Sequence, residues 1–283
     1  MSSQSGGYYL PEPSRWPIVG SIGIFLMAFG AVLTMNSVSG GGYVLLAGAA
    51  VIIYMMFGWF GNVIGESESG KYNKQVDVSF RWGMSWFIFS EVMFFACFFG
   101  ALFYMRILSV PWLDDAETGT LLWNGFTAGW PVSGPGITEQ FTPMGAWGLP
   151  AINTALLLSS GVTITVAHHA LKSNNRAVLN WFMFFTIALG AAFLYLQAVE
   201  YSHAYHELNL TLESGAYGAT FFMLTGFHGF HVTVGTLMLI VIWVRCLKGH
   251  FKPEHHFGFE GVAWYWHFVD VVWLGLFIFV YWL

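Results

Sequence analysis

Charged residues are scarce in this sequence, which excludes a soluble globular domain. Asp, Glu, Lys and Arg make up 9% of the 283 residues, whereas about a quarter of a soluble domain is charged. Hydrophobic residues reach 56%, aromatic residues 19%, and the mean hydropathy is +0.61. The net charge of −5 is small and not basic, so no nucleic acid is expected as a partner. The composition predicts an integral membrane protein.

Cysteines, nucleotide-binding motifs and internal repeats are also few or missing. Cys97 and Cys246 lie far apart in apolar stretches, which argues against a disulfide framework or a thiolate metal site. The sequence contains no P-loop, no glycine-rich nucleotide loop and no inverted repeat of the kind found in transporters. Residues 1–15 lack the basic start of a cleavable signal, so the first apolar helix is expected to stay in the protein.

The sequence does contain a series of long apolar segments. Each has about 20 residues or more, which is enough to cross a hydrocarbon core of about 30 Å as a helix. Glycine-rich, serine-rich or charged connectors separate them. We predict an all-α integral membrane protein, one membrane domain over residues 1–283, with seven transmembrane helices at 16–35, 43–64, 80–105, 147–171, 179–203, 217–247 and 258–283.

The positive charges predict the orientation of these helices. With the N-terminus inside, seven spans place nine Lys and Arg residues on the inner side and Arg106 alone on the outer side. This is the asymmetry expected of cytoplasmic loops, so we predict an inner N-terminus and an outer C-terminus. The connector 107–146 then lies outside, where we expect it to cap its own helix ends or to contact a partner subunit.

Glu91 is the only charged residue between Arg81 and Arg106. It follows Arg81 by ten residues, about 15 Å of helix, which places it near the midplane of the bilayer. Acidic residues at such depth are costly to ionise and are functional candidates. We predict a role in proton transfer or lipid contact, with a neutral, hydrogen-bonded structural acid as the alternative. Its helical neighbours one turn away are all apolar: Phe87, Ile88, Phe94 and Phe95.

Three further pairs of polar residues lie at helical spacing within the predicted spans. A carboxylate-bridged metal centre needs two E-x-x-H motifs and two further glutamates, and the sequence offers one such motif. The depths of Glu200 and His228 differ by roughly 10 Å, too far for one metal ion. We predict no metal and a structural role for all six residues, with a metal site or a proton path as the alternatives. The first two pairs are expected to form hydrogen bonds between helices, and the third pair to bond with each other or with a neighbouring helix. The pairs are Glu200 and His203, His228 and His231, and His267 and Asp270.

Two groups of histidines and lysines are predicted at the inner ends of the helices. Such basic groups attract anionic lipid headgroups, although they also serve simply to fix the orientation of the helices. One group contains His168, His169 and Lys172, and the other contains Lys248, His250, Lys252, His255 and His256.

Six segments are distinctive enough to suggest a family. They are 81–84 (RWGM), 90–95 (SEVMFF), 167–170 (AHHA), 226–232 (GFHGFHV), 255–260 (HHFGFE) and 263–273 (AWYWHFVDVVW). These segments resemble the cytochrome c oxidase subunit III family of the haem–copper oxidases. The likeness extends from Trp16 to the end of the sequence, and the predicted seven helices match that family independently of the segments.

The resemblance implies a non-redox accessory subunit of a proton-pumping aa3-type cytochrome c oxidase. Haem and copper would lie in partner subunits I and II, and cytochrome c would meet this chain only through the complex. Two N-terminal helices would lean away from a five-helix bundle, with structural phospholipids in the cleft between them. The chain would stabilise subunit I and, through Glu91, support sustained proton uptake. The expected location is the bacterial cytoplasmic (inner) membrane, with the mitochondrial inner membrane as the alternative.

The resemblance also implies sites of phospholipid binding. The lipid-contacting positions of the family map to Trp59, Glu66 and Arg81, and in a second group to Arg245, Lys248 and His250. One departure concerns the pattern W-x-R-D-x-x-R-E, which stands here as WFGNVIGE over residues 59–66, with Gly61 and Gly65 in place of two arginines. The lipid in the cleft would therefore be held more weakly or be zwitterionic.

Two other functions stay open on the sequence alone. A subunit III of a related quinol oxidase would share these segments, although a seven-helix chain with both N-terminal helices favours the cytochrome c type. A free-standing proton-coupled transporter would instead use Glu91 and the histidine pairs for its own transport cycle.

Overall fold

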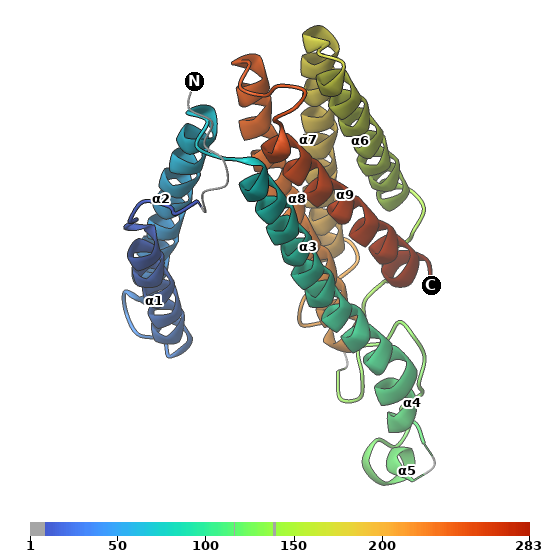
Figure 1. Cartoon of the computed structure of the whole chain (residues 1–283). Helices are drawn as coiled ribbons and strands as arrows, with labels where there is room; N and C mark the ends of the chain where they lie inside the picture. The colour runs from blue at the N-terminus through green and yellow to red at the C-terminus, as the bar shows by residue number, and fades with distance from the viewer. Residues whose placement is uncertain (1–8, 116, 138–139) are drawn as a thin grey trace, which may run out of the picture. The chain divides into compact units, whose positions relative to one another are not determined.

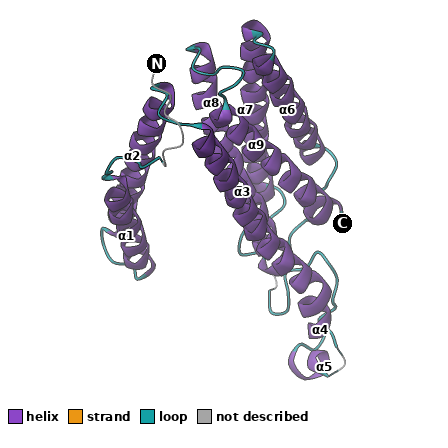
Figure 2. Cartoon of the chain, in the orientation of Figure 1, coloured by secondary structure: helices purple, strands orange, loops and turns teal. Residues whose placement is uncertain are grey.

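All regular structure in the described part of the chain is helical (Figure 2). The computed structural model describes residues 9–115, 117–137 and 140–283, so the polar start at 1–8 and loop positions 116, 138 and 139 lie outside it. Within these ranges the only β-type pairing is an isolated bridge between Lys252 and His255. The helices are α1 (Trp16–Met35), α2 (Gly41–Glu68), α3 (Lys74–Phe103), η1 (Tyr104–Ser109), α4 (Val110–Leu113), α5 (Thr118–Leu122), α6 (Leu149–Lys172), α7 (Arg176–His206), α8 (Gly215–Leu247), α9 (Phe257–Leu276) and η2 (Phe277–Trp282).

Seven of the helical stretches in the described residues are long and apolar enough to cross a membrane. This confirms the predicted all-α fold and the predicted number of spans. Two stretches combine several helices: Lys74–Leu113 runs through α3, η1 and α4, and Phe257–Trp282 runs through α9 and η2.

The third span differs from its predicted end at residue 105. Its helix passes through Arg106 as the wide π turn η1 and resumes as α4, with Pro111 at the start of that helix. A proline is tolerated at a first helical turn because its missing N–H needs no partner there. The Arg106 guanidinium donates to the carbonyl of Leu283, so this cation has a hydrogen-bond partner within the helical stretch.

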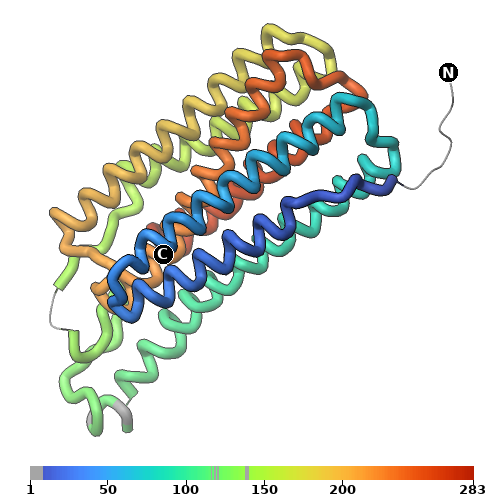
Figure 3. Tube along the Cα trace, turned by 90° about the vertical axis from the view of Figure 1, so that its left-hand side faces the viewer, coloured from blue at the N-terminus to red at the C-terminus, as the bar shows by residue number. Residues whose placement is uncertain are grey.

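The chain divides into two compact units, Met1–Phe80 and Arg81–Leu283, with the boundary inside α3. In the first unit α1 and α2 form an antiparallel hairpin (Figure 3). Glycines let the two backbones approach, as in other membrane helix pairs. A Cβ atom at Gly30 would collide with the backbone of Leu45, and one at Gly48 would lie 2.5 Å from the backbone nitrogen of Met27.

In the second unit α6, α7, α8 and α9 lie side by side around one core (Figure 1). The Thr163 and Thr186 hydroxyls meet at 2.8 Å and fix the register of α6 against α7. At the centre, Trp266 of α9 is fully buried, and its indole N–H donates to the Ser160 hydroxyl at 2.8 Å. Large buried side chains thus hold these four helices together.

The part of α3 within the second unit packs through aromatic side chains. The Phe94 ring lies 5.1 Å from the ring of Phe227 in α8, and the Phe87 ring lies 6.2 Å from that of Tyr265 in α9. Phe95, which is 2% exposed, contacts Phe268 of α9 with ring centroids 6.1 Å apart. This packing brings the middle of α3, where Glu91 stands, against α8.

Candidate functional site

Glu91 forms a hydrogen bond with a histidine from another helix. Its Oε2 atom lies 2.9 Å from Nε2 of His231, 140 positions along the chain. The His231 side chain is 9% exposed and that of Glu91 is 22% exposed, so the pair is largely removed from solvent. Sequence analysis found no partner for Glu91 on its own helix, and the structure supplies one from α8.

The geometry of His231 determines how the pair holds its proton. Nδ1 of His231 donates to the Phe227 carbonyl at 2.7 Å, which leaves Nε2 facing Glu91. The contact therefore contains one proton, either on a neutral glutamic acid that donates to imidazole or on an imidazolium that donates to carboxylate. Because each form contains one proton, the net charge of the pair is zero in both. Such a pair is suited to holding a proton within a membrane at low electrostatic cost.

Aromatic side chains surround this pair. The His231 ring lies 5.0 Å from Phe95 and 5.8 Å from Phe94, both on α3. On its other side it stacks on Tyr265 of α9 at 6.4 Å, and the Tyr265 hydroxyl donates to the His231 carbonyl at 3.4 Å. The rings restrict the imidazole to one orientation and keep it directed at Glu91.

Glu200 lies in a separate buried group. It is 0% exposed, and its Oε1 atom accepts a hydrogen bond from the Tyr281 hydroxyl at 2.6 Å. Its Oε2 atom has no hydrogen-bond partner among the described residues. His203, three residues on, turns away and pairs with Glu207 at 3.0 Å. The E-x-x-H spacing therefore forms no shared ligand set.

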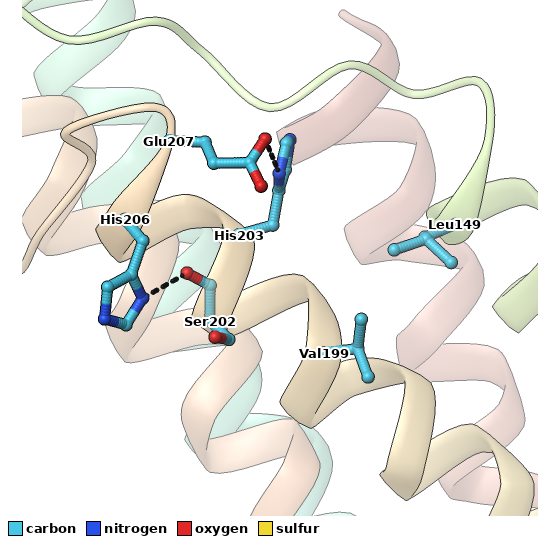
Figure 4. Close-up of a pocket in the computed structure, with 6 residues that line it drawn as sticks. All are labelled: Leu149, Val199, Ser202, His203, His206 and Glu207. Atoms are coloured by element: carbon cyan, nitrogen blue, oxygen red, sulfur yellow. Dashed lines mark hydrogen bonds and ion pairs between the residues drawn. The ribbon is translucent and has the colours of Figure 1, made fainter.

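His206, the last residue of α7, lies at the protein surface close to His203. Figure 4 shows a shallow pocket in which His203 points to Glu207, while Nδ1 of His206 donates to the Ser202 carbonyl at 2.8 Å. Leu149 and Val199 complete its lining. Each histidine is engaged by a neighbour on its own helix or at its end.

His228 contacts α9, and His267 contacts Asp270 of its own helix, while Nδ1 of His228 and Oδ1 of Asp270 have no hydrogen-bond partner among the described residues. Nε2 of the buried His228 donates to the Val269 carbonyl at 3.2 Å. Nδ1 of His267 lies 3.8 Å from Oδ2 of Asp270, and Nε2 of His267 lies 3.3 Å from the Thr165 hydroxyl. Of the six intramembrane polar residues, only His231 is brought to Glu91.

The residues expected to bind lipid in the first unit have contacts of their own. Trp59 is 53% exposed. Oε2 of Glu66 accepts from the hydroxyls of Tyr72 at 2.8 Å and Tyr9 at 2.9 Å. Burial, with the Glu66 carboxylate beside it, raises the pKa of the Tyr72 hydroxyl, so this phenol stays protonated and donates. Glu66 thus anchors the segment before α1 to the turn after α2.

Two of the expected lipid-binding cations in the second unit also contact the protein. Arg81 pairs with Glu260 at 2.6 Å and lies 5.5 Å from the centre of the Phe257 ring. The Arg245 guanidinium lies 4.4 Å over the Phe251 ring. Lys248, at the end of α8, is exposed. His250 follows it and is partly buried.

The pairing of Glu91 with His231 was not among the predictions from the sequence, although the sequence contains one signal for it. His231 is the middle residue of the span Gly215–Leu247, and Glu91 lies near the middle of Lys74–Leu113. Two ionisable groups at that depth both lack water and are natural partners. Tyr281 had no comparable signal, because it stands in an aromatic run that suits lipid equally well.

These contacts define the class: a helical membrane protein with seven candidate spans, whose intramembrane acids are held by side chains of the same chain. A family model for cytochrome c oxidase subunit III matches residues 6–283, and the chain belongs to that family. Proteins named cytochrome c oxidase subunit 3 match it over nearly their whole length. That of Marchantia polymorpha is 41% identical over 281 residues, covering 99% of this chain and 97% of the relative. Those of Phoca vitulina and Arabidopsis thaliana are each 41% identical over 283 residues, covering 100% of this chain and 99% and 98% of the relative.

Proposed function

We propose that this chain is the non-redox accessory subunit III of a proton-pumping aa3-type cytochrome c oxidase. The names of its relatives support membership of such a complex. In this proposal haem and copper lie in subunits I and II, which this chain contacts and stabilises. The complex stands in a bacterial cytoplasmic membrane, with the N-terminus of this chain inside. The chain also binds structural phospholipid.

The observation that best supports a proton-related role is the pair Glu91–His231. It is an acid and a base in contact at 2.9 Å, in the middle of two membrane spans. The pair would serve as a small proton store beside the uptake path of the catalytic subunit. Since it needs no metal and no substrate, this role fits an accessory chain.

Replacing Glu91 tests this proposal. The Glu91→Gln amide donates to the lone pair of His231 in place of the acid, so assembly and initial turnover should stay within about twofold of wild type. Sustained turnover and proton uptake should fall, because an amide cannot release the proton. The complex is purified in mild detergent through a tag on this chain, and haem absorbance, oxygen consumption over many turnovers and proton uptake are measured.

A neighbouring substitution provides the control for this experiment. Ser90→Ala removes a hydroxyl that donates only to the Phe87 carbonyl of its own helix, so it should leave all three measurements unchanged. A Glu91→Gln enzyme that is inactive with normal haem content would refute the accessory role. A chain that elutes alone, without haem, would refute the assignment to an oxidase.

The second proposed role, lipid binding, is best tested at Lys248. This cation is exposed at the end of α8, whereas Arg245 is stacked on Phe251 and its removal would also disturb packing. One lysine near a headgroup contributes about 1 kcal/mol, so Lys248→Ala should weaken anionic lipid binding about fivefold. Native mass spectrometry of the purified complex measures the retained lipid. Lys252→Ala, in the same loop, is the control; equal loss in both variants would indicate diffuse attraction instead of a site.

A further inference from the structure

Three side chains with metal-binding atoms converge where α6 ends and α9 begins. His168 lies in the last turns of α6, His256 immediately precedes α9, and Glu260 lies in its first turn. One ligand atom from each lies within 4.8 Å of the other two. Among the described residues this is the one such group of three, and it lies wholly within the second unit. Both histidines belong to the basic groups predicted at the inner helix ends, and the predictions did not connect them to Glu260.

The spacing of the two imidazoles matches a shared metal ion. Their Nε2 atoms lie 3.2 Å apart. Two nitrogens bound to one tetrahedral zinc ion, each at about 2.0–2.1 Å, are separated by about 3.3 Å. This separation, at which the two nitrogens share a hydrogen bond when no ion is bound, is compatible with one shared ion.

The hydrogen bonding of His256 leaves the correct nitrogen for a metal. Its Nδ1 atom faces the Lys252 carbonyl at 3.3 Å and serves as the donor of that contact. The Nε2 atom consequently bears the lone pair, which accepts from Nε2–H of His168 in the absence of a metal and could bind an ion in its place. A backbone carbonyl behind the second ring nitrogen is the usual arrangement for a histidine that binds a metal. The imidazole of His168 is restricted by the Phe259 ring, whose centroid lies 5.5 Å from its own.

Glu260 supplies the oxygen ligand and is itself oriented. Its Oε2 atom pairs with Arg81 at 2.6 Å, and its side chain is 16% exposed. Arg81 thus orients the carboxylate, and one of its oxygens lies within 4.8 Å of a ring nitrogen of each histidine. Two imidazoles and one carboxylate suit zinc and related borderline cations, whereas magnesium and calcium prefer oxygen ligands throughout.

We propose that His168, His256 and Glu260 form a binding site for one Zn²⁺-class cation, with water as the fourth ligand. The site is independent of the proposed accessory function, since it lies on other residues than Glu91 and His231. It places a metal between the end of α6 and the start of α9, two segments separated by 88 positions in sequence.

Adjacent histidines make a matched test possible. The complete complex is stripped with a chelator and titrated with Zn²⁺ alone, in competition with a zinc indicator dye. His168→Gln and His256→Gln should each weaken one Zn²⁺ site at least about tenfold. His169→Gln and His255→Gln remove the neighbouring imidazoles and should leave that affinity unchanged. Zinc sites in other subunits are common to all variants and cancel in the comparison.

Two outcomes would contradict the proposed site. One is an equal Zn²⁺ affinity in all variants, and the other is an equal loss of Zn²⁺ affinity in the His169 and His255 controls. Glu260→Asp keeps a carboxylate for Arg81 but shortens the side chain by one methylene, so it should also weaken Zn²⁺ binding. This variant tests the site even where a histidine variant fails to assemble. Co²⁺ added to the stripped complex should give a tetrahedral absorption band that is weaker in His256→Gln. A band identical in both proteins would contradict the assigned ligands.

Discussion

Replacing Trp266 with alanine is expected to lower the free energy of unfolding by about 3–5 kcal/mol. The side chain is 0% exposed and occupies the space left by two glycines of neighbouring helices. A Cβ atom at Gly190 of α7 would lie 2.8 Å from the indole ring, and one at Gly235 of α8 would lie 2.9 Å from it. With the hydrogen bond to Ser160 of α6, this one ring contacts three helices. Its removal leaves a cavity that none of them can close alone.

Thermal unfolding of the purified protein in detergent measures this effect. Trp181→Ala is the control, because Trp181 is 63% exposed on α7 of the same bundle. Trp266→Phe should show an intermediate loss, since it keeps a ring but not the donor to Ser160, a bond contributing about 1 kcal/mol. If Trp266→Ala unfolds at the same temperature as Trp181→Ala, the central position assigned to this ring is wrong.

Removing the Tyr281 hydroxyl should destabilise the protein by about 1–3 kcal/mol. The hydroxyl is the donor to Oε1 of the fully buried Glu200. In Tyr281→Phe the acid stays buried with neither oxygen satisfied by a described residue. Stability is again measured by thermal unfolding, with Tyr195→Phe as the control, since Tyr195 is 70% exposed on α7.

A double variant separates this effect from simple loss of packing. Adding Glu200→Leu to Tyr281→Phe replaces both polar partners by apolar groups, which is nearly neutral when the shapes fit. The double variant is therefore expected to be more stable than Tyr281→Phe alone. A double variant less stable than either single variant would show that Glu200 contributes through contacts other than Tyr281.

The number of helices could be predicted from the sequence because each span is a long apolar run bounded by polar residues. The predictions were weakest at helix ends. The third helix continues past Arg106 because a partner distant in sequence, Leu283, satisfies that guanidinium. Whether a charge ends a helix thus depends on what the fold places beside it, and a single sequence does not contain that information.

The partners of the buried acids illustrate the same limit. The depth of Glu91 follows from helix rise alone, since Arg81 marks the end of the apolar stretch. Which helix faces it does not follow, because helices without long polar stripes give few clues to their packed side. The pairing with His231 depends on the aromatic packing of Phe94 and Phe95 against α8 and α9.

The glycine contacts of the α1–α2 hairpin restrict where an acyl chain can lie in the first unit. At Gly30 and Gly48 the two helices meet backbone to backbone, with no room for even a methyl group. A lipid tail therefore cannot insert between the helices at these positions, and the two helices present one continuous surface to the membrane. Lipids can therefore contact this unit only on the outer surface of the hairpin, where Trp59 is exposed.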